Sequence, residues 1–230
     1  MIACQLCGSI GAVVRGVIRL FIPGRLRRWL RRSRLEGPRR DRERLLCQLP
    51  KAGAIVEVGI WEGDFSQRLL DSLRPRTLHL VDPWQFVPEQ KSAWCGGARA
   101  KSQDDMDRIY EGVIARFAPE IADGQVVVCR EPSVSAAERM ASRKFDAVYI
   151  DGDHTYDAVR ADLRAWAPLV AEDGVLTGDD YGDYGWWAGG VKRAVNEFAS
   201  QGWTLSLIGS QFLLQRISGS DGADQRDSTR

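Results

Sequence analysis

The chain has 230 residues and a mass of 25.7 kDa, the size of one ordinary domain with modest additions. With 44% hydrophobic and 27% charged residues and 23 glycines, its composition is that of a globular protein and excludes a collagen, a coiled coil or a wholly disordered chain. The formal net charge of +1 conceals a division, because residues 1–44 carry a charge of +9 and the remaining residues carry −8.

The first 44 residues contain twelve arginines, no lysine and three acids. The arginines are interleaved with apolar residues such as Val17, Leu20 and Trp29, which predicts a basic amphipathic arm over residues 1–44. Such an arm can lie on an anionic membrane, bind a nucleic-acid backbone, join two subunits of a homo-oligomer, or pack as a solvated helix on its own domain. The last interpretation is the simplest.

The chain shows no clear targeting signal. Arg15 and Arg19 interrupt the apolar N-terminal stretch before it reaches the roughly 18 apolar residues of a membrane-spanning helix, and no basic segment precedes it. Five scattered cysteines do not suggest a disulfide framework: Cys4, Cys7, Cys47, Cys95 and Cys129. We therefore expect a cytoplasmic protein, with peripheral membrane contact through the arm as an option, and a frayed tail over residues 218–230.

Between residues 45 and 217, short apolar runs typical of β-strands alternate with segments of helical periodicity. Five runs fit parallel strands: Ala54–Val58, Thr77–Val81, Gln125–Cys129, Ala147–Ile150 and Gly174–Thr177. Only two residues separate Trp203–Ile208 from Gln211–Gln215, so these last runs must form an antiparallel hairpin. Residues 45–217 therefore predict a doubly wound α/β domain with a mostly parallel, seven-stranded sheet that ends in a β-hairpin. Five strands that alternate with helices and are followed by a hairpin argue against a nicotinamide-binding domain.

A glycine-containing loop follows the first predicted strand. Glu57, Gly59 and Gly63 lie where that strand turns into a helix, and glycine there permits a tight turn and close approach of a ligand. Asp82 ends the second strand, 25 residues after Glu57, where a carboxylate can accept hydrogen bonds from ribose hydroxyls. An ordinary strand-to-helix turn is the alternative. Together, the loop and Asp82 predict a site for a nucleoside-containing cofactor.

The charges around this loop indicate which cofactor would bind. Glu57, Glu62 and Asp64 would repel a pyrophosphate, whereas they suit a cationic ligand. The sulfonium of S-adenosylmethionine matches them better than a dinucleotide does. Glu131 and Ser133 follow the third strand, where we expect the adenine to be held, with a plain turn as the alternative.

Three aspartates follow neighbouring strands of the predicted sheet. Asp151 ends the fourth strand, and Asp179 and Asp180 end the fifth. Because the carboxyl ends of parallel strands share one edge, these like charges would repel one another unless a cation lay among them. Oxygen ligands favour a hard ion, Mg²⁺ first and Mn²⁺ as an option. Asp151 is also expected to contact the cofactor, whereas Asp153 is better explained as a cap for the following helix.

His154 lies three residues beyond Asp151 and can face the same site. Imidazole is suited to removing a proton near neutral pH, so we expect His154 to be the catalytic base. Support of a metal ligand, or metal ligation by His154 itself, are the alternatives. His79 lies inside an apolar strand and reads as a core residue.

These motifs are similar to those of a known family. The segments IVEVGIWEGDFS, LHLVDPW, YIDGDHTYDAVRADLRAW, GVLTGDDYG and VKRAVNEF together resemble class I S-adenosylmethionine-dependent methyltransferases, and most closely the metal-dependent, macrocin-type sugar O-methyltransferases. The resemblance covers residues 52–215. It implies that Asp151, Asp179 and Asp180 hold Mg²⁺ and that His154 is the base. Trp61 stands where a small residue is common, and the basic arm lies outside the match.

The combined expectation is an S-adenosylmethionine-dependent, Mg²⁺-assisted methyltransferase that acts on a hydroxyl of a sugar, glycoside or related small molecule. Four tryptophans are expected near the site, and aromatic faces suit a sugar ring: Trp84, Trp94, Trp186 and Trp187. Ordinary packing explains each of them equally well. The alternatives are a methyltransferase of RNA or of a phenolic small molecule, and an inactive module that binds the cofactor or a membrane. Acids near the site disfavour nucleic acid as a partner.

Overall fold

The computed structural model describes residues 37, 40–87, 100–185 and 187–217. The frayed tail, Trp94, Trp186 and most of the basic arm lie outside these residues, so the predictions for them are untested. One compact unit begins at Asp41 and contains everything described below. No helix among the described residues is long and apolar enough to cross a membrane.

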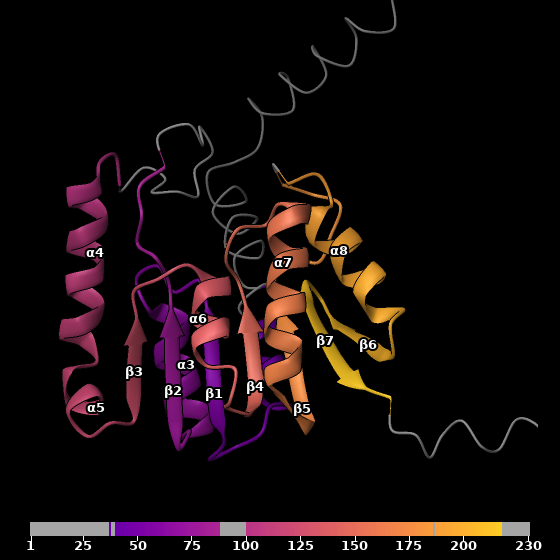
Figure 1. Ribbon diagram of the computed structural model, residues 1–230, viewed down its shortest axis with the longest axis horizontal. Coiled ribbons are helices and arrows are strands. Elements are labelled where there is room, and N and C mark those ends of the chain that lie inside the picture. Colours follow the sequence, from indigo (N-terminus) through magenta and orange to yellow (C-terminus); the bar gives the residue numbers. More distant parts are fainter. Residues whose placement is uncertain (1–36, 38–39, 88–99, 186, 218–230) are drawn as a thin grey trace, which may run out of the picture. The chain divides into compact units, whose positions relative to one another are not determined.

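A seven-stranded sheet forms the centre of the unit, in the order β3-β2-β1-β4-β5-β7-β6 (Figure 1). The strands are β1 (Ala54–Val58), β2 (Thr77–Val81), β3 (Val126–Cys129), β4 (Phe145–Ile150), β5 (Val170–Gly178), β6 (Trp203–Ile208) and β7 (Gln211–Arg216). Strands β1 to β5 pair in parallel, whereas β7 runs antiparallel to both β5 and β6. The predicted fold class, including the terminal hairpin, is confirmed.

Helices connect the strands and cover both faces of the sheet. They are α3 (Asp64–Leu73), α4 (Gln103–Arg116), α5 (Ala118–Ala122), α6 (Ser133–Arg139), α7 (Tyr156–Trp166) and α8 (Gly190–Ala199), with a 3₁₀ turn at Ala167–Leu169. In Figure 1, α6 and α7 lie in front of the sheet and α3 lies behind it. Because the strand order reverses at β1, crossovers of the usual right hand place the helices of the two halves on opposite faces of the sheet.

Successive side chains along a strand point to opposite faces of the sheet, and this alternation divides the core into two layers. On β1, Val56 and Val58 pack with α6, α7 and α8, whereas Ile55 packs on the opposite face with α3 and α4. The same division separates Val148 from Tyr149 on β4. Strands buried on both faces are apolar at nearly every position, which is why these runs were recognisable in the sequence.

Residues 41–46 are helical, and the segment that follows packs on the α3 face. Leu45, Leu46 and Leu49 are almost fully buried in that layer of the core. Apolar anchoring of this kind fixes the short helix against the sheet. It thereby determines where the neighbouring polar side chains, including Arg42, are placed.

Candidate active site

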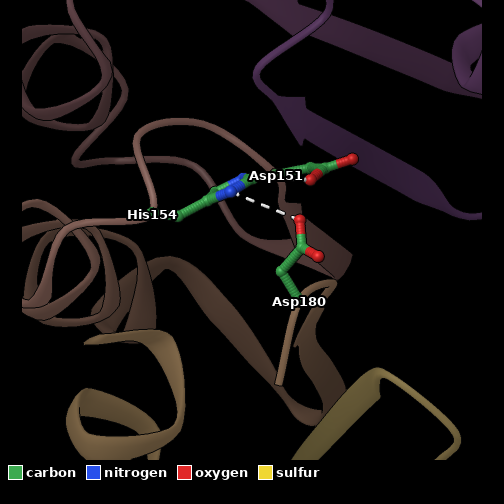
Figure 2. Close-up of side chains that lie close together, drawn as sticks. All are labelled: Asp151, His154 and Asp180. Atoms are coloured by element: carbon green, nitrogen blue, oxygen red, sulfur yellow. Dashed lines mark ion pairs between the residues drawn. The ribbon is translucent and has the colours of Figure 1, made fainter. Parts of the chain in front are cut away.

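Asp151, His154 and Asp180 converge at the carboxyl ends of β4 and β5 (Figure 2). His154 Nε2 lies 3.4 Å from Asp151 Oδ1, and its Nδ1 lies 3.3 Å from Asp180 Oδ2. One ligand atom from each of the three residues lies within 4.8 Å of the others. The imidazole is therefore held between two carboxylates and is almost completely buried.

The adjacency of β4 and β5 explains why residues almost thirty positions apart meet. Ile150 pairs with Gly178, so the residues that follow each strand leave the sheet side by side. Asp180 has a φ of 62°, in the left-handed region that aspartate tolerates better than most residues. Its backbone N–H donates to Asp179 Oδ1 over 2.7 Å, which stabilises this turn.

Burial and mutual repulsion shift the protonation of this cluster. Burial and the neighbouring charge of Asp179 raise the pKa of Asp180 to about 6. Burial likewise raises the pKa of Asp151. For His154, burial alone would lower the pKa, but its hydrogen bond to Asp151 and the charges of Asp151 and Asp180 raise it overall. The imidazole is thus a better proton acceptor than an isolated histidine.

Arg42 reaches the same cluster from the helix at residues 41–46. Its Nη2 lies 2.7 Å from Asp151 Oδ2 and 2.7 Å from Asp179 Oδ2, and its Nε donates to Asp179 Oδ2 over 2.9 Å. The guanidinium carbon also lies 5.0 Å from the centre of the Phe65 ring. One arginine therefore bridges two of the three aspartates that the sequence predicts as metal ligands.

Asp179 differs from its neighbours because donors surround it. Besides Arg42, Ser210 Oγ donates to Asp179 Oδ1 over 2.6 Å, and the Asp180 N–H donates to the same oxygen. Burial would raise the pKa of Asp179, but Arg42 and these hydrogen bonds outweigh that effect and lower it. Arg42 thus contacts Asp179 and Asp151, whereas His154 contacts Asp151 and Asp180, so Asp151 is shared between the two groups.

The predicted cofactor loop is tied to Asp82 by backbone hydrogen bonds. Asp82 Oδ2 accepts the N–H groups of Ile60 and Trp61 at 2.9 and 3.1 Å, and its Oδ1 accepts the Trp84 N–H at 2.7 Å. Trp61 and Trp84 adopt φ values of 55° and 42°, a strained conformation for tryptophan. Because a carboxylate oxygen has two lone pairs, Oδ1 retains an acceptor position that could face a ribose hydroxyl.

The other predicted residues of this loop lie around or beneath it. Glu57 is 1% exposed, so it lies under the loop, and its Oε2 makes no hydrogen bond. Burial raises the pKa of Glu57 to about 8. Gly59 and Gly63 have φ values of 85° and 77°, as tight turning requires. Asp64 pairs with Arg116, which neutralises part of the negative charge expected at this helix N-terminus.

The loop after β3 brings Glu131 and Ser133 to the start of α6. Glu131 pairs with Arg139, whose Nε donates to Glu131 Oε1 over 2.9 Å. Ser133 Oγ accepts a hydrogen bond from Trp166 Nε1 over 2.8 Å. Both side chains therefore have partners on α6 or α7, so any contact with an adenine would add to an existing network.

Among the predicted aromatic residues, Trp84 and Trp187 have different roles. Trp84 is fully buried, and its Nε1 donates to the Trp61 carbonyl, so packing explains it. Trp187 lies edge-on to His154 with ring centres 4.9 Å apart, and half-exposed Tyr184 lies 5.8 Å beyond. An aromatic wall therefore borders the imidazole on the side of α8.

Two smaller predictions also have structural outcomes. The prediction that Asp153 caps the helix is wrong, because the N-cap residue of α7 is Thr155 and no side chain caps the helix; Asp153 Oδ1 instead accepts the Thr155 N–H over 2.8 Å and closes the turn that leads into α7. His79 is buried on β2, and burial lowers its pKa to about 4, as expected for a neutral core histidine.

The fold and the position of this cluster define a class I, Rossmann-like methyltransferase architecture. A family model described as a methyltransferase domain matches residues 56–181, more than half of the chain, and the protein belongs to that family. No curated protein matches the chain. The narrower assignment to the macrocin-type group stays a prediction.

Three solved structures share the fold at low sequence identity. Cofactor-bound Rv0187 from MTB is 15% identical, with a TM-score of 0.56 over 79% of this chain and 81% of that chain. The O-methyltransferase NovP is 22% identical, with a TM-score of 0.50 over 80% of each chain. CalS11, a calicheamicin methyltransferase, is 16% identical, with a TM-score of 0.53 over 86% of this chain and 82% of that chain.

Proposed function

We propose that this protein transfers a methyl group from S-adenosylmethionine to a hydroxyl oxygen of a sugar, glycoside or related small molecule. The observation that carries the proposal is His154, held between Asp151 and Asp180 at the strand ends where ligands of open α/β sheets bind. Membership of a methyltransferase family supports the reaction class. The acceptor class is supported by CalS11, which is described as a TDP-rhamnose 3'-O-methyltransferase.

In this proposal the cofactor lies along the loops after β1, β2 and β3. Gly59 and Gly63 permit close approach, Glu57 supports the loop from beneath, and Asp82 accepts a ribose hydroxyl at Oδ1. Residues after β3 and β4 complete the cofactor site: Glu131, Ser133 and Asp151. The carboxylates suit the positive sulfonium, and alignment of its methyl group with the acceptor oxygen supplies a large part of the rate.

The transfer itself requires one proton acceptor. The acceptor oxygen forms a bond to the methyl carbon as the carbon–sulfur bond breaks, S-adenosylhomocysteine leaves, and the hydroxyl proton passes to His154. Asp151 and Asp180 stabilise the resulting imidazolium, because each lies within 3.4 Å of a ring nitrogen. Trp187 and Tyr184 form an apolar wall against which one face of a sugar ring can pack.

The donor set also fits the divalent ion that the sequence resemblance implies. Asp151 and Asp180 offer carboxylate oxygens close together beside the imidazole of His154. Mg²⁺ or Mn²⁺ accepts such oxygen ligands. When bound there, the ion would acidify the acceptor hydroxyl, and His154 would still receive the proton.

The test is release of S-adenosylhomocysteine by the purified chain with panels of glycosides, catechols and RNA, each with and without EDTA. We expect turnover with glycosides that chelation suppresses. Turnover confined to catechols or RNA would contradict the acceptor class, and full activity in EDTA would contradict metal assistance. Failure of S-adenosylmethionine to bind in calorimetry would overturn the proposed function itself.

A further inference from the structure

The carboxylate cluster already contains one cation supplied by the chain itself. Arg42 places its guanidinium between Asp151 and Asp179, with 2.7 Å contacts from Nη2 to both carboxylates. A cation shared by two acids is the arrangement that a metal bridging the same acids would make. Because Arg42 occupies this position, the roles of the three aspartates need not be equal.

Asp179 has little acceptor capacity left for a metal ion. A carboxylate offers about four lone-pair positions, and four contacts approach Asp179: two from Arg42, one from Ser210 and one from the Asp180 N–H. Asp151, in contrast, gives only Oδ2 to Arg42, and its Oδ1 faces His154. Asp180 is approached by His154 at Oδ2.

The net charge of the cluster also supports different roles for Asp179 and for the pair Asp151 and Asp180. Asp151, Asp179 and Asp180 carry three negative charges when ionised, and Arg42 offsets one of them. The remaining charge of −2 matches a single divalent ion placed on the Asp151–Asp180 side. Such an ion could bind without displacing the arginine.

Arg42 is firmly anchored. Its helix continues into Leu45 and Leu46, which are buried in the core, and its guanidinium lies over the Phe65 ring. Withdrawal of Arg42 would leave buried Asp179 and partly buried Asp151 without their counter-charge, which is costly. Coexistence of Arg42 with the metal is therefore favoured over displacement.

We propose that Arg42 is a resident counter-cation that withholds Asp179 from metal coordination, so that a divalent ion at this site is bound by Asp151 and Asp180 beside His154. This inference rests on the proposed function only in its assumption that the site takes a divalent ion. It assigns Arg42 as a positioning residue and changes the ligand set that the resemblance implies.

The test is Mn²⁺ binding to the full chain, measured from the electron paramagnetic resonance signal of free Mn²⁺. The double variant Arg42→Gln/Asp179→Asn conserves the net charge and keeps an oxygen for Ser210 and the Asp180 N–H. We expect its Kd for Mn²⁺ to stay within about threefold of the wild-type value, because the ligands and net charge are retained. Asp180→Asn should weaken binding about tenfold or more.

A second measurement distinguishes coexistence from displacement. Amide hydrogen exchange of residues 41–47 should be unchanged when Mn²⁺ saturates the wild-type protein, because Arg42 stays in place. Arg44→Gln is the matched control, since Arg44 lies on the same helix with its side chain 70% exposed. Its Mn²⁺ affinity should equal that of the wild type.

Three outcomes would overturn the inference: equal losses in the double variant and in Asp180→Asn, faster exchange of residues 41–47 on Mn²⁺ binding, or no Mn²⁺ binding by the wild type. Calorimetry with S-adenosylmethionine on the same samples separates these failures from failure of the proposed function. Cofactor binding with either of the first two outcomes would leave the proposed function standing and remove only the assigned role of Arg42, whereas cofactor binding without Mn²⁺ binding would leave methyl transfer standing but remove metal assistance as well.

Discussion

The two halves of the site lie along the same edge of the sheet, but they stabilise buried carboxylates differently. After β1 and β2, Asp82 is satisfied by three backbone N–H groups. After β4 and β5, Asp151 and Asp179 share the side chain of Arg42, and His154 lies between Asp151 and Asp180. Backbone donors cannot leave or change charge, whereas an imidazole can gain or lose a proton.

This difference indicates a division of labour. The Asp82 half is organised as a rigid receptor whose loop conformation is set by hydrogen bonds and includes two strained tryptophans. The β4–β5 half keeps side chains that can exchange protons and accept a cation. Binding of the cofactor is therefore expected to depend chiefly on the first half, with Asp151 as a further contact, and proton transfer on the second.

The strongest challenge to this division is removal of His154. His154→Ala should lower the rate of methyl transfer by about 10²–10⁴-fold, the usual contribution of a positioned general base, while the Kd of S-adenosylmethionine changes little. Single-turnover kinetics and calorimetry would measure the two effects. Asp153→Asn is the control, because Asp153 is exposed and the amide oxygen can still accept the Thr155 N–H. A parallel loss of cofactor affinity in His154→Ala would contradict the division.

The two halves meet at Gly59, so substitution there should damage both. A Cβ added at Gly59 would overlap the backbone carbonyl of Asp151, and the φ of 85° disfavours any side chain. Gly59→Ala should therefore lower the free energy of unfolding by about 3 kcal/mol, from overpacking and backbone strain together. Urea denaturation would measure the loss. Gly124→Ala is the matched control, because its φ of 73° is similar but no atom lies within 4 Å. Equal losses in the two variants would show that strain alone is responsible.

Loss of the Asp82 carboxylate should affect only the half of the site that follows β1 and β2. Asp82→Ala leaves three backbone N–H groups without their acceptor, and we expect a decrease of about 1–3 kcal/mol in the free energy of unfolding, with weaker binding of S-adenosylmethionine. Urea denaturation and calorimetry are the measurements. Asp157→Ala, at a side chain that is 86% exposed, should change neither quantity. Unaltered cofactor affinity in a folded Asp82→Ala protein would remove Asp82 from the cofactor site.

Sequence periodicity predicted the sheet well because buried parallel strands are apolar throughout. The limits of β1, β2 and β6 agree with the predicted runs, whereas β5 begins at Val170 rather than Gly174. Glu172 and Asp173 in its first half are exposed, and that polarity hid the start of the strand. Apolar runs reveal only the buried part of a strand.

The convergence of Asp151, His154 and Asp180 was also predictable, because parallel pairing places the ends of β4 and β5 together. The contribution of Arg42 was not. Arg42 is one of twelve arginines in residues 1–44, and no local pattern distinguishes it from the others. Its position depends on long-range packing of Leu45 and Leu46 in the core, which residue spacing does not encode.

A pH-dependent effect on stability is expected from Glu57, the buried acid that connects the two halves. Its pKa is raised to about 8, chiefly by burial, with further contributions from the charges of Asp151 and Asp82, whereas Ser66 and Arg42 act in the opposite direction. At pH values above about 4.5, the ordinary pKa of its carboxyl group, Glu57 loses its proton in the unfolded chain. In the folded protein it keeps that proton until the pH reaches about 8. Glu57 therefore makes the protein progressively less stable as the pH rises from about 4.5 to about 8, and no further above that.

Glu57→Gln removes this titration while keeping the shape of the side chain. The difference in unfolding free energy between Glu57→Gln and the wild type should increase in favour of the variant from pH 5 to pH 8 and then level off. Urea denaturation at several pH values measures that difference, and Glu111→Gln, at an exposed position on α4, is the control. A difference independent of pH would show that Glu57 titrates in the folded protein as it does in the unfolded chain, so that burial does not hold it protonated.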